Sequence, residues 1–169
     1  MESGYDKDSN QMKDIPKTNV MRLLENAGIP FRVKACDVSD GRLDAGTLAE
    51  RIGEEPDRVF KTLVTRSGPR EYFVFVIPGN ASLNLKKAAK ASGQKSIELI
   101  AQKELCPLTG YVHGGCSPVG QKKLFPTYID ETAQLYDYIC VSGGHIGVSI
   151  AIEPEALRAF INAHFADLT

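Results

Sequence analysis

Residues 110–130, GYVHGGCSPVGQKKLFPTYID, carry the strongest structural signal in this chain. Gly114, Gly115 and Gly120 bracket the Ser117–Pro118 pair. Glycine reaches positive φ and lacks the Cβ that would block a ligand, whereas proline fixes its own φ and pushes the preceding residue towards an extended conformation. Such a loop can point several backbone N–H groups at a ligand oxygen. From composition alone, a tight surface turn between two strands is an equal interpretation.

Two further motifs flank this loop in the sequence: FKTLV at residues 60–64 and VSGG at residues 141–144. Together with GGCSPVGQKK at residues 114–123, and in this order, they resemble the YbaK-type Cys-tRNA(Pro) deacylases. These are free-standing relatives of the editing domain inserted in bacterial prolyl-tRNA synthetases. The resemblance covers residues 18–168, including LNLKKAAKASG and a closing helix that ends in FADL.

Composition and charge narrow the class of protein. The chain has 169 residues, 43% hydrophobic and 24% charged, which is typical of one soluble globular domain. A net charge of −1 argues against a protein that coats nucleic acid, since that requires many basic residues. Contact with RNA would therefore be local. The candidate contacts, for which a solvated polar face is the alternative interpretation, are Lys86, Lys87, Lys90, Lys122 and Lys123.

The cysteines indicate a reducing environment. Cys36, Cys106, Cys116 and Cys140 form no CxxC motif, and no Cys/His pair has zinc-ligand spacing. We therefore expect free thiols, and neither metal nor cofactor. The sequence shows no secretory signal and no apolar run near the ~20 residues that span a bilayer. These features predict a soluble cytoplasmic protein that does not contact a membrane.

The hydrophobic pattern predicts an α/β fold. Residues 1–17 are polar and aperiodic and are expected to form a disordered tail, leaving residues 18–169 as one domain. We expect helices over residues 18–27, 44–52, 85–92 and 154–165, and strands over residues 31–36, 61–65, 72–77, 127–130, 138–141 and 147–152. A turn at Gly143–Gly144 should join the last two strands. The resemblance implies a curved, barrel-like mixed sheet surrounded by helices.

Conventional catalytic motifs are scarce. No nucleophile elbow, P-loop or dinucleotide fingerprint is present, and His113, His145 and His164 lack metal-site spacing. A structural or incidental role is the preferred interpretation for each histidine. Cys116 lies inside the glycine loop, but a nucleophilic role would require a base and a lowered pKa. Since relatives often carry an apolar residue there, we interpret Cys116 as a packing residue.

The resemblance assigns the site residues. It makes Lys61 of FKTLV the catalytic residue, although the lysine alone would suggest a side chain snorkelling from a strand edge. The substrate-binding residues that the motifs imply are Thr62, Gly114, Gly115, Ser117, Ser142 and Gly143. Asp130 is a candidate acid at the pocket rim, and a strand-end carboxylate in a turn is an equal interpretation.

The resemblance also implies a mechanism that needs few protein catalysts. The substrate would be an aminoacyl ester on the terminal adenosine of tRNA, and a cysteinyl thiol would attack its own ester carbonyl. The protein would bend the ester, exclude water and stabilise the carbonyl oxygen with backbone N–H groups and one cation. The implied partners are the acceptor end of aminoacyl-tRNA and, in a transient complex, prolyl-tRNA synthetase.

Two departures from the family leave alternatives open. Relatives often carry an aromatic residue at the position of Cys36 and another in the following loop, which is shortened here at residues 37–46 and contains Leu43. One alternative is therefore a deacylase for Ala- or Ser-tRNA that activates a water. The other is a non-catalytic module that binds a nucleotide or an acceptor end.

Overall fold

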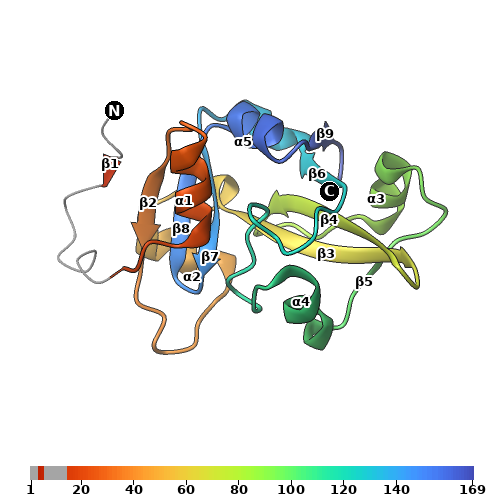
Figure 1. The fold of residues 1–169 in the computed structure, drawn as a ribbon, viewed down its shortest axis with the longest axis horizontal. Helices are drawn as coiled ribbons and strands as arrows, with labels where there is room; N and C mark the ends of the chain where they lie inside the picture. The colour runs from red at the N-terminus through yellow and green to blue at the C-terminus, as the bar shows by residue number, and fades with distance from the viewer. Residues whose placement is uncertain (1–3, 6–14) are drawn as a thin grey trace.

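The computed structural model describes residues 4, 5 and 15–169 of the chain (Figure 1). Its helices are α1 (Asn19–Asn26), α2 (Ala45–Ile52), α3 (Leu85–Ser92), α4 (Gln102–Thr109) and α5 (Pro154–Phe160), with short 3₁₀ helices η2 (Pro56–Arg58) and η3 (Glu131–Leu135). Its strands are β1 (Gly4–Tyr5), β2 (Arg32–Ala35), β3 (Phe60–Gly68), β4 (Glu71–Pro78), β5 (Glu98–Leu99), β6 (Thr127–Asp130), β7 (Ile139–His145), β8 (Val148–Ile152) and β9 (His164–Ala166). The predicted disordered tail falls mainly on residues 1–3 and 6–14, outside the described residues.

The strands form two mixed sheets, in the orders β1-β2-β8-β7 and β5-β3-β4-β6-β9. The α/β class is confirmed, but the barrel-like expectation is not, because the sheets of the described residues do not form a closed barrel. The isolated parallel bridge between Val59 and Cys140 links their margins. Between this bridge and the pairing of Thr65 with β5, one edge of β3 has no strand paired to it among the described residues.

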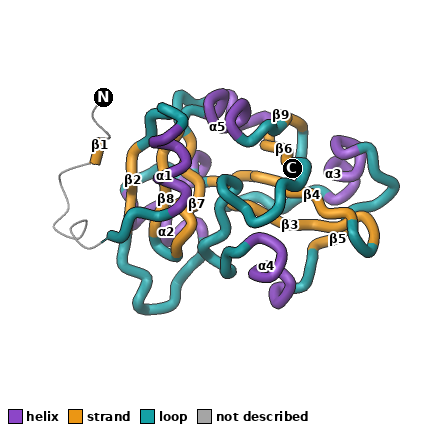
Figure 2. The backbone as a smooth tube through the Cα atoms, viewed as in Figure 1, coloured by secondary structure: helices purple, strands orange, loops and turns teal. Residues whose placement is uncertain are grey.

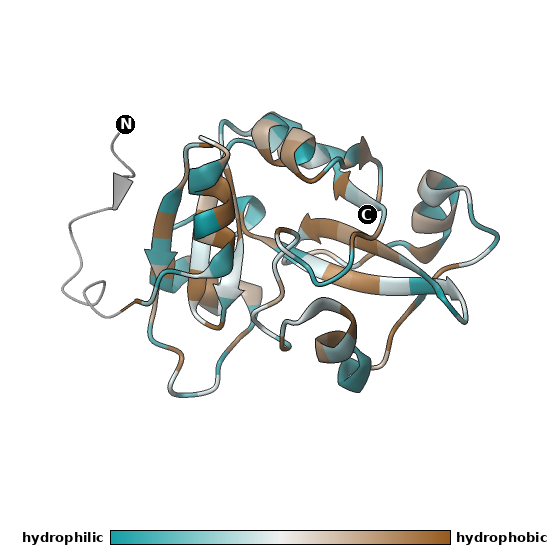
Figure 3. Cartoon of the chain, in the orientation of Figure 1, coloured by the Kyte–Doolittle hydropathy of each residue, from teal (hydrophilic) through white to brown (hydrophobic). Residues whose placement is uncertain are grey.

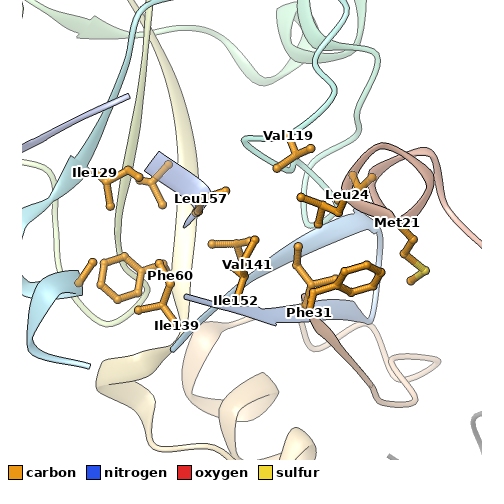
Figure 4. Packing of buried hydrophobic residues seen from close by; sticks show 14 of the residues in the cluster. Met21, Leu24, Phe31, Phe60, Val119, Ile129, Ile139, Val141, Ile152 and Leu157 are labelled. Atoms are coloured by element: carbon orange, nitrogen blue, oxygen red, sulfur yellow. The ribbon is translucent and has the colours of Figure 1, made fainter. Parts of the chain in front are cut away.

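Apolar burial holds the two sheets together. The largest hydrophobic cluster joins Val20, Met21 and Leu24 of α1 to residues of both sheets, among which Figure 4 labels Val141 of β7 and Ile129 of β6. Strand β4 is buried on both faces, as predicted, and Figure 3 colours much of it brown. A second cluster packs alternate residues of β4 against α3. No helix of the described residues is long and apolar enough to cross a membrane.

The predicted turn at Gly143–Gly144 is wrong. Strand β7 continues through both glycines to His145, and the turn falls at Ile146 and Gly147. The register between β7 and β8 shifts between Ser142 and His145, and Gly144 has a φ of +92°. Glycine accommodates that φ without Cβ strain, so the sequence signal marked a β-bulge rather than a turn.

The C-terminal helix is shorter than predicted. Helix α5 ends at Phe160. Asn162 has a φ of +53°, and a right-handed helix cannot continue through a residue with a positive φ. The chain then forms β9, parallel to β6, so the segment expected to be the end of a helix is a strand. Helix α4 was not predicted over its full length. It begins where the Glu104 carboxylate accepts a hydrogen bond from the Ala101 N–H at 2.8 Å.

Candidate functional site

A cavity of about 470 Å³ lies where the first half of β3 meets the N-terminus of α2, the β7–β8 hairpin and the glycine loop. The predicted residues that line it are Lys61, Thr62, Gly114 and Ser142. These come from three sequence segments more than 25 residues apart, and Figure 2 shows the glycine loop as a long irregular segment between α4 and β6. The fold thus brings the three motifs to one place.

The free edge of β3 forms one wall of the cavity. β4 pairs along the whole of β3, but β5 pairs only with Thr65 and Arg66. The Val64 carbonyl accepts a hydrogen bond from the Ile100 N–H at 3.3 Å on the β5 side. Residues two apart in a strand direct their N–H and C=O groups to the same edge. Those of Thr62 therefore face the β5 side, as those of Val64 do. Thr62 therefore presents a backbone donor and acceptor where no described strand pairs with them.

The Thr62 hydroxyl is an unusual buried group. Its Oγ1 is buried and forms no hydrogen bond with any described residue. A buried polar group without a partner costs on the order of 1–3 kcal/mol. Since Thr62 lines the cavity, a ligand there would supply the missing partner.

Lys61 extends from the opposite face of β3, because consecutive strand residues alternate. Its ammonium forms no ion pair or hydrogen bond within the described part of the chain. Partial burial lowers the pKa of Lys61 below its ordinary value, since desolvation disfavours the charged form. The cavity lining therefore includes an unpaired, partly desolvated cation and, from the neighbouring residue, an unsatisfied hydroxyl.

Glycines let the loop lie against its neighbours. A Cβ on Gly114, which has a φ of +86°, would come within 2.8 Å of Leu43 Cδ1. Gly115 is buried, and a Cβ there would lie 3.1 Å from the Ile146 backbone nitrogen. Gly114 lines the cavity, whereas Gly115 permits the close packing of the loop on the β7–β8 turn.

Residues 117–119 anchor the glycine loop. Ser117 is fully buried and does not line the cavity; its Oγ accepts a hydrogen bond from the Val119 N–H at 3.2 Å. Val119 enters the main core, and its carbonyl accepts a hydrogen bond from the Tyr111 hydroxyl at 2.5 Å. Burial, followed by the nearby Cys116, raises the pKa of Tyr111 to about 12, so the phenol remains a donor. Ser117 thus holds the loop in shape rather than facing a ligand.

The VSGG segment contributes one hydroxyl. Ser142 lines the cavity, and its Oγ accepts a hydrogen bond from the Gly144 N–H at 3.2 Å, which leaves its proton available to a ligand. Gly143 does not line the cavity. A Cβ on Gly143 would lie 3.0 Å from Val148 Cγ1, so this glycine permits hairpin packing.

Asp130 lies away from the cavity and differs from the expected rim acid. Its side chain is buried at the end of β6, where Oδ1 accepts from the Leu168 N–H at 3.0 Å. Its Oδ2 accepts from the Thr132 N–H at 3.3 Å and the Thr132 hydroxyl at 2.5 Å. These contacts fix the C-terminus and η3, which matches the alternative interpretation of a strand-end carboxylate.

The cavity cysteines are poor nucleophiles. Burial raises the pKa of Cys116 and of Cys140 to about 12 and raises the pKa of Cys36 above its ordinary value. All three line the cavity. No group of three His, Cys, Asp or Glu side chains among the described residues could hold a metal ion.

Several residues of the cavity wall were not predicted from the sequence. Asp44, Ala45 and Leu48 line the cavity from the N-terminus of α2, and the expected helix start at Asp44 was the only signal. Gly79 also lines it, and a Cβ there would lie 2.4 Å from Ala45 Cβ. No pattern in the sequence indicated this contact.

The histidines divide between cavity and surface. His113 lines the cavity. The exposed His145 has Nδ1 2.9 Å from the Ile146 carbonyl oxygen, and His164 belongs to β9 rather than to the helix expected there. None of the three is held by a carboxylate in the described chain, so none is oriented as a general base.

Comparison with known proteins identifies the family. The profile of the aminoacyl-tRNA editing domain matches residues 41–160. The chain belongs to this family, and the resemblance noted from its motifs is confirmed.

Individual relatives are named as a deacylase, a trans-editing enzyme or a proline–tRNA ligase. A protein of Enterococcus faecalis, provisionally named Cys-tRNA(Pro)/Cys-tRNA(Cys) deacylase EbsC, is 47% identical over 153 residues, 90% of this chain and 93% of that protein. A crystal structure provisionally described as a trans-editing enzyme for prolyl tRNA synthetase has a TM-score of 0.77 and 28% identity, covering 90% of this chain and 98% of that one. A proline–tRNA ligase of Shouchella clausii is 29% identical over 80% of this chain but only 22% of the ligase.

Proposed function

We propose that this protein is a trans-editing deacylase that clears mischarged Cys-tRNA(Pro), and also acts on Cys-tRNA(Cys). The observation that carries the proposal is that Lys61 and Thr62 both line the cavity at the free edge of β3 and supply it with an unpaired cation and a buried hydroxyl without a partner. Both are suited to a carbonyl oxygen that gains negative charge. The 47% identity to a protein named for these two substrates supports the same substrate class.

The proposed chemistry does not use a cysteine of the protein as nucleophile. Raised pKa values keep the thiols of Cys116 and Cys140 protonated at neutral pH, so an acyl-enzyme on these thiols is disfavoured. In the proposed step, the substrate sulfur attacks its own ester carbonyl, a C–S bond forms and the C–O bond to the ribose breaks. The thiol proton passes to the departing ribose oxygen, giving free tRNA and a cyclic thioester.

The protein contributes positioning and charge. Lys61 and the Thr62 hydroxyl stabilise the carbonyl oxygen, and the Thr62 peptide group aligns the acyl chain along the strand edge. Hydrogen bonds from Thr47 lower the pKa of Asp44, so its carboxylate is ionised at neutral pH and can bind the substrate α-ammonium. Prolyl-tRNA synthetase, acting in a transient complex in the cytoplasm, would deliver the tRNA.

Deacylation of Cys-, Ala-, Ser- and Pro-charged tRNA(Pro) by the parent protein and Lys61→Ala tests the proposal. We expect fast loss of the cysteinyl ester alone, slowed about 10²-fold or more by the substitution. Consumption of the alanyl or seryl ester instead would show that the site catalyses hydrolysis by an activated water. Binding without consumption of any ester would make the protein a binding module.

A further inference from the structure

A second groove of about 470 Å³ lies on the other side of the glycine loop. It runs between the loop, the starts of β6 and β9 and the end of α5 (Figure 1). We define the second groove by six of its lining residues: Pro118, Lys123, Leu124, Tyr128, Phe160 and His164. No function assigned above uses it.

The charge of the second groove differs from that of the whole chain. The chain has a net charge of −1, yet no Asp or Glu is among the groove's lining residues, which include Lys123 and His164. Lys123 is exposed and forms no ion pair or hydrogen bond with a described residue, and the adjacent Lys122 is also exposed. The groove is thus suited to an anionic ligand.

Apolar and aromatic surface accompanies the positive charge. Leu124 is 97% exposed and Phe160 is 36% exposed, both on the groove. The Tyr128 ring is fixed by stacking on Phe75, with centroids 5.6 Å apart, and its centroid is 6.0 Å from that of the His164 ring. Rigid aromatic side chains beside cations are the usual means of binding unpaired nucleotides.

One rigid loop connects the two sites. Cys116 lines the cavity and Pro118 lines the second groove, two Cα–Cα steps of about 3.8 Å apart. Val119, buried in the main core, fixes the loop between them. The cavity and the second groove therefore lie on the two sides of one short loop.

We propose that the second groove binds the unpaired nucleotides preceding the terminal adenosine of the aminoacyl-tRNA. This inference rests on the proposed function, which places the ester in the cavity. A phosphate would contact Lys123, and a base would stack on the exposed face of Phe160. Lys87 of α3 is less suitable, because its Nζ forms an ion pair with Asp167 at 3.0 Å and donates a hydrogen bond to the Thr169 carbonyl at 2.6 Å.

The test uses Lys123→Glu and Phe160→Ala, with Lys95→Glu as the matched control. Lys95 is an exposed lysine between α3 and β5 and does not line the groove. Affinity for a single-stranded oligonucleotide of the acceptor 3′ end that carries no amino acid is measured by fluorescence anisotropy at several salt concentrations. We expect each groove variant to bind about tenfold more weakly, Lys123→Glu to reduce the salt slope by about 0.7, and Lys95→Glu to match the parent.

Kinetics on two substrates separates this proposal from the proposed function. The groove variants should raise KM for charged tRNA about tenfold, with the loss confined to substrates longer than 3′-cysteinyl-adenosine. If the parent consumes neither substrate, the proposed function fails, and oligonucleotide binding still decides the role of the groove. Parent-like binding by both groove variants would overturn the proposal. So would normal RNA binding combined with lost binding to prolyl-tRNA synthetase, which would make the groove a protein-docking surface.

Discussion

Thr62→Val should stabilise the fold and impair the reaction at the same time. The Thr62 hydroxyl is buried without a partner, and valine has the same shape without that hydroxyl. Leaving a buried hydroxyl unsatisfied costs about 1–3 kcal/mol, and its removal should recover part of that cost. We expect the free energy of unfolding to rise by about 1 kcal/mol, which corresponds to about 2–4 °C in Tm at this chain length. Loss of one donor to the carbonyl oxygen should slow deacylation about 10²-fold.

The same strand offers a matched control. Thr65 is fully buried in β3, and its Oγ1 donates a hydrogen bond to the Phe73 carbonyl at 2.9 Å. Thr65→Val makes the same chemical change where the hydroxyl has a partner. It should therefore lower the free energy of unfolding by about 1 kcal/mol. Both substitutions keep a β-branched residue, so strand propensity does not distinguish them.

Urea unfolding and single-turnover deacylation of charged tRNA measure the two effects. Equal destabilisation by Thr62→Val and Thr65→Val would show that the Thr62 hydroxyl is satisfied within the fold. Unchanged deacylation by a stabilised Thr62→Val would show that the hydroxyl does not contact the substrate. Either result would refute the reasoning that joins this buried group to the ligand.

Three further substitutions test the packing and charge around the cavity. Because burial lowers the pKa of Lys61, the contribution of this residue to the free energy of unfolding should increase as pH rises through that lowered pKa towards 10.5. In pH-dependent urea titrations the parent should therefore gain stability relative to Lys61→Met, while the raised pKa values of Cys116 and Cys140 lower the stability of both proteins alike. Gly79→Ala would place a Cβ 2.4 Å from Ala45 Cβ and should cost about 1–3 kcal/mol, whereas Gly68→Ala, with no atom within 4 Å, should be nearly neutral in the same assay; equal effects would contradict the packing argument. Asp130→Asn disturbs the acceptors of Leu168 and Thr132 and should lower Tm while kcat/KM of the folded fraction stays at the parent value; a selective loss of kcat would restore Asp130 as a site residue.

Local chemistry made several elements predictable. Asp44 and Asn84 cap α2 and α3 through their side chains, and Gly53 and Gly93 end these helices with positive φ. Such signals depend only on residues within one helical turn. The bulge at Gly144 and the end of α5 at Phe160 were misjudged, because the bulge depends on the register of the β7–β8 hairpin, and the chain after α5 pairs with β6, which is distant in sequence.

The candidate site could be predicted only in part from the sequence. No local pattern brings Lys61, Gly114 and Ser142 together; the family resemblance did so, and the cavity agrees with it. Resemblance also placed Ser117 and Gly143 in the substrate-binding set, whereas the structure uses one to anchor a loop and the other to pack a hairpin. Motif residues adjacent to a site therefore include those that shape it without facing the ligand.

The raised pKa values of the cavity cysteines give the site a chemical selectivity. A pKa of about 12 leaves Cys116 and Cys140 with a thiolate fraction at pH 7 on the order of 10⁻⁵. An ordinary cysteine thiol, with a pKa of about 8.5, has a fraction of about 3 × 10⁻² at the same pH. A bound cysteinyl ester would thus present roughly 10³ times more reactive thiolate than either protein residue, before any gain from proximity. Burial protects these protein thiols from acylation, so a cavity lined by cysteines can still leave the attack to the substrate.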